Sequence, residues 1–123
     1  MILVDTSVWI DNFCHDDPAL GRSLGQRQVL SHPFVIGELA LSSLRQRDLV
    51  LEALRGLPSA LVAHDDEVHA FIDRHRLFGM GIVYIDAHLL AATFLTPDAR
   101  FWTRSKRLRA AASQLGVDAN VDQ

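Results

Sequence analysis

Short apolar runs alternate along this chain with longer segments in which apolar residues recur at helical spacing. The runs Ile2–Val4, Val29–Leu30 and 100–103 predict buried strands. Another apolar run lies at 61–63, and 117–119 is a candidate for a last strand. Helices are expected from Thr6 or Ser7 to about Asp16, then over 33–44, 48–57, 65–75 and 86–95, and from a cap at Ser105 to Gly116. Short strands that alternate with helices predict an α/β fold with a mainly parallel sheet.

Length and composition predict a single folded domain over residues 1–123. The chain is 49% hydrophobic and 22% charged, which is ordinary for a globular protein, and it contains no internal repeat and no Gly/Ser linker. The formal net charge is −3, so binding to nucleic acid would need a local basic cluster.

The N-terminal segment and the single cysteine predict a cytoplasmic protein. The first residues lack a basic stretch and reach Asp5 at once, which is unlike a signal peptide. No apolar run approaches the ~20 residues that span a bilayer, so no membrane partner is expected. Cys14 has no second cysteine to pair with, and we expect it to be a small buried side chain.

Three carboxylates stand alone in otherwise uncharged segments. Asp5 carries the only charged side chain between Met1 and Ile10. Glu38 is the only one from residue 33 to residue 44, and Asp86 carries the only formal charge from residue 78 to residue 97. A buried, unpaired carboxylate is costly, so it protonates, pairs with a cation or binds a metal.

Strand and helix geometry predicts that these three acids converge. Asp5 ends the first strand, and sites in open parallel sheets gather outside the carboxyl ends of strands. Asp86 shares the inward face of its helix, and Glu38 lies on a helix that is almost entirely apolar. A cluster of carboxylates completed by water suits Mg²⁺ or Mn²⁺. Taken singly, Asp5 or Asp86 could cap a helix, and Glu38 could be a core acid paired with an arginine.

Four segments of the sequence resemble the motifs of a known family, in the same order. They are Val4-Asp5-Thr6-Ser7-Val8-Trp9-Ile10, Gly37-Glu38-Leu39, Ile85-Asp86-Ala87-His88-Leu89-Leu90-Ala91-Ala92 and Phe101-Trp102-Thr103-Arg104-Ser105-Lys106-Arg107-Leu108. Together they resemble the PIN domain of the VapC branch, and the resemblance covers nearly the whole chain.

The resemblance implies a three-layer α/β/α sandwich and a divalent-metal endoribonuclease, the toxin of a toxin–antitoxin pair. It also implies a homodimer and a VapB-type antitoxin, which we expect to cover the apolar surface of residues 34–57. Asp5 and Asp86 would hold the metal, while Glu38 would hold or deprotonate the attacking water. Thr6 and Thr103 would not bind the metal themselves but would orient its carboxylates or waters through hydrogen bonds.

The fourth motif departs from the family pattern at one position. Ser105 stands where the family ordinarily carries an aspartate, and its hydroxyl could hydrogen-bond a metal-bound water, as Thr6 and Thr103 could, but it brings no negative charge. One metal remains feasible, whereas a second is doubtful. The alternative function is therefore a catalytically weakened PIN domain that binds RNA or antitoxin. Receiver and phosphatase readings fit poorly, because Ser7 stands where a phosphatase carries its second aspartate and Lys106 follows a helix cap.

The basic, aromatic and histidine residues give further expectations. Five of the twelve basic residues fall within ten positions, and Arg104, Lys106 and Arg107 among them are candidates for RNA phosphate contacts, although a solvated helix face is an alternative. Trp9 and Trp102 are expected in the core rather than stacked on bases. His69 and Asp73 lack a third zinc ligand at suitable spacing. His64, His75 and His88 are expected to be surface or cap residues.

Overall fold

The computed structural model describes residues 1–121, so the last two residues of the predicted 1–123 domain lie outside the described part. In chain order the elements are β1 (Ile2–Val4), α1 (Thr6–Cys14), α2 (Pro18–Gly25), β2 (Val29–Leu30), α3 (Pro33–Ala40), α4 (Arg47–Arg55), α5 (Asp65–His75), α6 (Tyr84–Leu95), β3 (Arg100–Trp102) and α7 (Lys106–Gln114).

A parallel sheet in the order β2-β1-β3 forms the centre of the fold. Ile2 is opposite Val29 on one side and Arg100 on the other, and Val4 is opposite Trp102. All three strands therefore end at the same edge of the sheet. The predicted parallel α/β architecture is confirmed.

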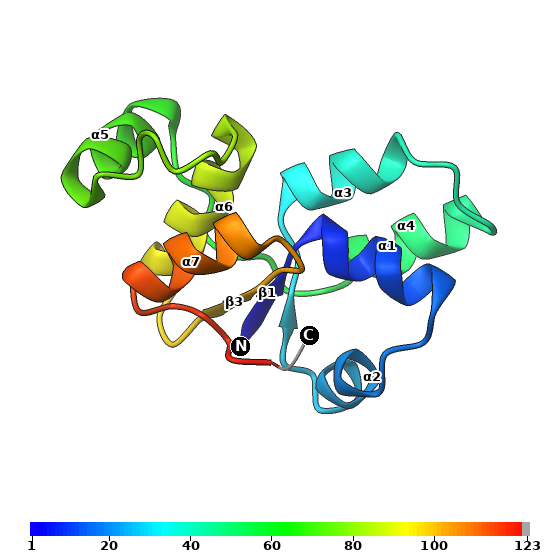
Figure 1. Cartoon of the computed structure of the whole chain (residues 1–123). Coiled ribbons are helices and arrows are strands. Elements are labelled where there is room, and N and C mark those ends of the chain that lie inside the picture. The colour runs from blue at the N-terminus through cyan, green and yellow to red at the C-terminus, as the bar shows by residue number, and fades with distance from the viewer. Residues whose placement is uncertain (122–123) are drawn as a thin grey trace.

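Helices cover both sides of this sheet (Figure 1). In that view α6 and α7 lie to the left of the strands, and α1, α3 and α4 lie to the right. The core between them is built from fully buried side chains of the strands and of α6, including Leu3, Phe101, Trp102, Leu89 and Leu90. Helix α5 packs on α6 rather than on the sheet, through a small cluster of Ala63, Val68, Ala87 and Ala91.

Helix α2 was not predicted from the sequence. Asp17 begins it, since its carboxylate accepts hydrogen bonds from the backbone N–H groups of Ala19 and Leu20, and Pro18 occupies the first position. The helix buries only Leu20 fully and contains two glycines. Its apolar pattern is therefore weak, and its capping residues carry the stronger signal.

Some predicted boundaries were wrong. Helix α3 ends at Ala40 instead of Leu44. Residues 61–63 form no strand, and Leu61 and Val62 are exposed, whereas 117–119 contributes a single bridge between Asp118 and Phe101. A short apolar run becomes a strand only where a neighbouring strand offers backbone partners.

Individual burial expectations divide in the same way. Trp9 and Trp102 are buried in the core, as expected. The expectation for Cys14 was wrong, because it is exposed at the last residue of α1. Among the described residues, no helix is long and apolar enough to cross a membrane.

Candidate active site

Asp5 lies where β1 passes into α1, at the carboxyl edge of the sheet. Its backbone N–H donates to the carbonyl of Trp102 at 2.9 Å, which fixes it beside the end of β3. The residue is only 7% exposed. It occupies the N-cap position of α1 but makes no side-chain cap bond there. The capping alternative therefore does not explain the Asp5 side chain.

Two hydroxyl groups hold the Asp5 carboxylate instead. Ser7 donates to Oδ2 at 2.7 Å and Thr103 donates to the same oxygen at 2.8 Å. Ser7 in turn accepts from the backbone N–H of Arg104, and Thr103 accepts from that of Ser105. Because each hydroxyl is itself fixed by backbone, the carboxylate is held in one orientation.

Glu38 reaches the same region from α3. Thr6, the first residue of α1, donates its hydroxyl to Glu38 Oε1 at 2.7 Å. Thr6 directly follows Asp5, so this bond brings the second carboxylate beside the first. In Figure 1 the first turns of α1 and α3 lie together above the strand ends.

Asp86 approaches from the first turn of α6. Its Oδ2 accepts the backbone N–H of Val83 at 3.2 Å, so the carboxylate also caps its own helix. Burial raises the pKa of Asp86 above the ordinary carboxyl value, and the negative charges of Asp5 and Glu38 raise it further. The hydrogen bond from the Val83 N–H lowers the pKa of Asp86, because it favours the ionised carboxylate. Asp5 and Glu38 therefore both lie close enough to Asp86 for their charges to act on it.

Among residues 1–121, no cationic side chain forms an ion pair with this group of acids. None of the ion pairs between residues 1 and 121 includes Asp5, Glu38 or Asp86. The pairing of Glu38 with an arginine, considered from sequence, is thus not found. Within the same span, no three His, Cys, Asp or Glu side chains are arranged to hold a metal ion. Hydrated Mg²⁺ needs only one or two carboxylates beside its waters, so the donor set still suits it.

Ser105 lies at the edge of the site as the N-cap of α7. Its Oγ accepts the backbone N–H of Leu108 at 3.2 Å, and its own N–H is bound to Thr103. The predicted cap is confirmed. Ser105 is thus linked to Asp5 through one hydroxyl, and it contributes no charge to the acids.

The three candidate phosphate-binding residues have different surroundings. The Arg104 guanidinium is paired with Asp17 and lies 3.1 Å from Asp11, and its carbon is 5.4 Å from the centre of the Trp102 ring. It ties α1 and α2 to the loop after β3. Lys106 and Arg107 are exposed at the start of α7 and form no ion pair among the described residues.

The histidine expectations are met in part. His64 is exposed and is the N-cap of α5. The expectation for His88 was wrong, because it is buried and its Nε2 lies 3.0 Å from Asp65 Oδ1. His32, to which the sequence gave no role, is fully buried, and burial lowers its pKa to about 4. These rings pack around Phe34 between α3 and α6.

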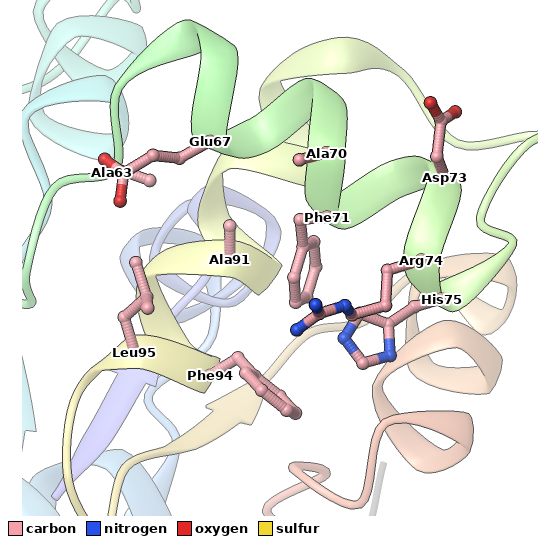
Figure 2. Close-up of a pocket in the computed structure, with 10 residues that line it drawn as sticks. All are labelled: Ala63, Glu67, Ala70, Phe71, Asp73, Arg74, His75, Ala91, Phe94 and Leu95. Carbon is pink, nitrogen blue, oxygen red and sulfur yellow. The ribbon is translucent and has the colours of Figure 1, made fainter.

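A broad hollow on the described surface lies apart from the three acids. Figure 2 shows it between α5 and the second half of α6, with a volume of about 560 Å³. Phe71, Ala91, Phe94 and Leu95 form its apolar walls, and the His75 ring packs against those of Phe71 and Phe94. Its apolar character suits a protein contact better than phosphate chemistry.

Sequence reasoning missed Ser7, which holds Asp5 as directly as Thr103 does. The signal was present, because a hydroxyl two residues after a strand-end aspartate can turn back onto it. The contact between the buried His88 and the exposed Asp65 was also missed. It joins residues 23 positions apart and has no local signature.

The fold and the site define an α/β sandwich protein with an acidic site at the carboxyl edge of its sheet, the PIN-like class expected from the sequence. The chain is 48% identical over 117 residues to Ribonuclease VapC32 from two strains of Mycobacterium tuberculosis, and the match covers 95% of this chain and 94% of each relative. No family model and no solved structure matches it. At this identity and coverage, the chain belongs to the VapC ribonuclease family.

Proposed function

We propose that this protein is a Mg²⁺- or Mn²⁺-dependent endoribonuclease that acts as the toxin of a type II toxin–antitoxin pair. The observation that carries the proposal is the approach of Asp5 and Glu38 to Asp86, whose pKa their negative charges raise, with no ion pair from any of the three acids among residues 1–121, in a chain of this family. Such a group favours a divalent cation, which removes the repulsion and supplies positive charge beside a phosphate.

The residues divide the proposed reaction between them. Asp5 and Asp86 would hold the ion, which when bound stabilises negative charge on the phosphate and favours ionisation of water. Glu38, steadied by Thr6, would orient the attacking water and accept its proton. Thr103 and Ser7 both bind Oδ2 of Asp5 and keep this carboxylate oriented, which would leave Oδ1 for the ion. The products would be the two ends of a hydrolysed RNA phosphodiester.

RNA binding is proposed for the start of α7. Lys106 and Arg107 are exposed next to Ser105, at the rim of the acidic site, and would contact phosphates beside the cleaved bond. Arg104 is committed to Asp11 and Asp17, so we assign it a positioning role. This assignment separates one arginine of the cluster from the others.

Two protein partners are proposed with the function. Leu41 and Leu49 are 91% and 63% exposed on the surface formed by α3 and α4, which supports an antitoxin segment covering that surface. The exposed Phe94 and Leu95 beside the larger hollow support a homodimer through α5 and α6. Light scattering of the purified protein would measure the oligomeric state.

A cleavage assay tests the catalytic proposal. Purified protein, freed of antitoxin, is incubated with total RNA and Mg²⁺ or Mn²⁺, with EDTA as the control. Asp86→Asn and Glu38→Gln should each lower cleavage by at least about a hundredfold, as expected for loss of a metal ligand or a general base. Glu67→Gln changes an acid of α5 outside the site and should cleave normally.

Two results would contradict the proposal. If cleavage persists in EDTA, the reaction does not require a divalent metal and that part of the proposal is wrong. A protein that binds antitoxin but cleaves no RNA with either ion would be the weakened, binding-only PIN domain considered as the alternative.

A further inference from the structure

A second, smaller hollow lies beside the acidic site. It has a volume of about 240 Å³ and is formed by the end of α5, the loop 76–83 and the start of α6. Ile72, Leu77 and Ala87 form its apolar floor, and Phe78, Val83 and Tyr84 stand around it. Its size and lining suit one flat apolar group rather than a long chain.

The position of this hollow connects it to the carboxylates. Val83 lines it and also donates its backbone N–H to Asp86 Oδ2 at 3.2 Å. Tyr84 lies two residues before Asp86 in the same helical turn. A group placed in the hollow is therefore one helical turn or less from the backbone of a proposed metal ligand.

Two aromatic rings at the hollow are open to solvent. Phe78 is 66% exposed and Tyr84 is 42% exposed. Tyr84 is held in place, since its hydroxyl donates to Asp65 Oδ1 at 2.9 Å and its ring packs edge-on against His88. The tryptophans, which could also have stacked on bases, are both buried. An exposed ring that is already held in place, as Tyr84 is, binds a partner with a low entropic cost.

A positive charge is fixed at the same loop. Gly81 has a φ of +76°, and a Cβ built there would lie 2.9 Å from Nη1 of Arg107. The arginine of α7 thus packs directly on the glycine of the loop. Gly81 lies in the loop between Gly79 and Ile82, which both line the hollow, so the guanidinium lies against the loop that forms it.

We propose that this hollow is a nucleobase subsite, which takes one base of single-stranded RNA next to the cleaved phosphodiester, with Arg107 on a neighbouring phosphate. The inference rests on the proposed ribonuclease function. Stacking on Phe78 and Tyr84 would place the strand, because single-stranded RNA is recognised through unstacked bases on aromatic rings. Discrimination among bases would come from the shape of the hollow.

The charges favour RNA over a protein segment as the occupant. A peptide would gain little from a fixed guanidinium beside an apolar hollow, whereas a nucleotide presents a flat apolar base and an anionic phosphate together. The negative carboxylates repel a phosphate when no metal is bound. Arg107 and Lys106 supply the attraction that brings the strand to the site.

Binding in EDTA tests the subsite apart from cleavage. The probe is a short oligouridylate that carries one 2-aminopurine, whose fluorescence falls when the base stacks. Phe78→Ala should weaken binding about tenfold and lessen the quenching, as expected for one lost stacking contact. Phe78→Trp should restore both, whereas Phe78→Leu, which keeps an apolar side chain, should not. Phe13→Ala removes an exposed phenylalanine of α1 and serves as the matched control.

A glycine pair tests the position of Arg107. Gly81 and Gly116 both have positive φ, so alanine strains the backbone alike at either position. Only at Gly81 would the new methyl group contact Arg107, since nothing lies within 4 Å of a Cβ at Gly116, which follows α7 outside the hollow. Gly81→Ala should therefore weaken RNA binding severalfold more than Gly116→Ala, to about the affinity of Arg107→Ala.

The outcomes separate this subsite from the proposed function. If the unmodified protein cleaves RNA while Phe78→Ala and Phe78→Leu bind the probe normally, the subsite is wrong and the ribonuclease stands. If these variants bind RNA normally but lose affinity for the antitoxin, the hollow is a protein contact. If the unmodified protein neither binds the probe nor cleaves total RNA, the function and the subsite both fail.

Discussion

At the scale of single residues, Asp86 shows how one side chain serves two needs. Its carboxylate caps α6 through Val83, and this bond favours the ionised form. Burial and the neighbouring acids favour the protonated form more strongly, so the pKa of the folded protein is raised. The folded state then holds this proton to a higher pH than the unfolded chain does. Stability of the metal-free protein is therefore lost as the pH rises from about 3.8 through the raised pKa.

Asp86→Asn should stabilise the metal-free protein at neutral pH while abolishing cleavage. Asparagine keeps an acceptor for the Val83 N–H but carries no charge among the acids. We expect the Tm in EDTA at pH 7 to rise by roughly 2–4 °C, and the gain to vanish below about pH 4, where the aspartate is protonated. Thermal unfolding at several pH values measures this. A lower Tm at pH 7 would show that the cap bond outweighs the repulsion.

Ser105→Asp should strengthen Mg²⁺ or Mn²⁺ binding severalfold and raise cleavage. Aspartate is as good an N-cap as serine, so α7 should still begin at Lys106, while a fourth carboxylate joins the site. The added repulsion should lower the metal-free Tm modestly. Calorimetric titration measures the metal affinity of Ser105→Asp and of Ser105→Asn, which keeps a capping oxygen without adding charge. Equal metal affinity in the two variants would make the fourth position dispensable.

At the scale of elements, Arg104 joins parts of the chain that are remote in sequence. It follows β3, and its guanidinium meets Asp11 of α1 and Asp17, the cap of α2. Its backbone N–H also binds Ser7, which holds Asp5. One residue thus connects the first two helices to the loop that carries Thr103 and Ser105. Loss of a mostly buried ion pair leaves carboxylates without their partner.

Arg104→Ala and Arg107→Ala should therefore change different properties, the stability of the fold and the binding of RNA respectively. Arg104→Ala should destabilise the fold by about 1–3 kcal/mol, measured by urea denaturation, because Asp17 loses its partner. Arg107→Ala should leave stability within about 0.5 kcal/mol and reduce the salt dependence of RNA binding. An unchanged salt slope in Arg107→Ala would place that arginine on a merely solvated helix face.

At the scale of the whole molecule, the proposed functions occupy different faces. The acids and the smaller hollow lie at the carboxyl edge of the sheet, and the larger hollow lies between α5 and α6. The exposed leucines of the proposed antitoxin surface belong to the segment of α3 and α4. Because Glu38 is on α3, a segment that covers this surface lies beside the acids and can close the site.

Changing Leu41 and Leu49 together to aspartate should separate toxicity from neutralisation. Expressed alone, the protein and the variant should both stop growth, because the acids are untouched. Co-expressed antitoxin should rescue growth with the unmodified protein and fail with the variant, since the covered apolar surface is lost. Leu61→Asp changes an exposed leucine outside α3 and α4 and should still be neutralised. Rescue of the double variant would place the antitoxin on another surface.

The local pattern by itself determined the element types and the identity of the three acids. Strands β1, β2 and β3 could be predicted because each is a short apolar run. Ser105 could be predicted as an N-cap because it precedes a helical pattern. Asp5, Glu38 and Asp86 were found because a charge in an apolar segment is costly wherever the chain folds. Helix α2 was not predicted, because the evidence for it lies in its capping residues rather than in its apolar residues.

The tertiary structure alone decided which side chains meet and which remain free. Arg104 and Arg107 are equivalent in the sequence, yet one is held by two carboxylates and the other packs on Gly81. His88 is buried where its ring packs on Phe34 and Tyr84, and Cys14 is exposed at the end of α1. Periodicity reports the face of an element that turns inward. Contacts between segments far apart in the sequence depend on how those elements pack, and that packing leaves no local pattern.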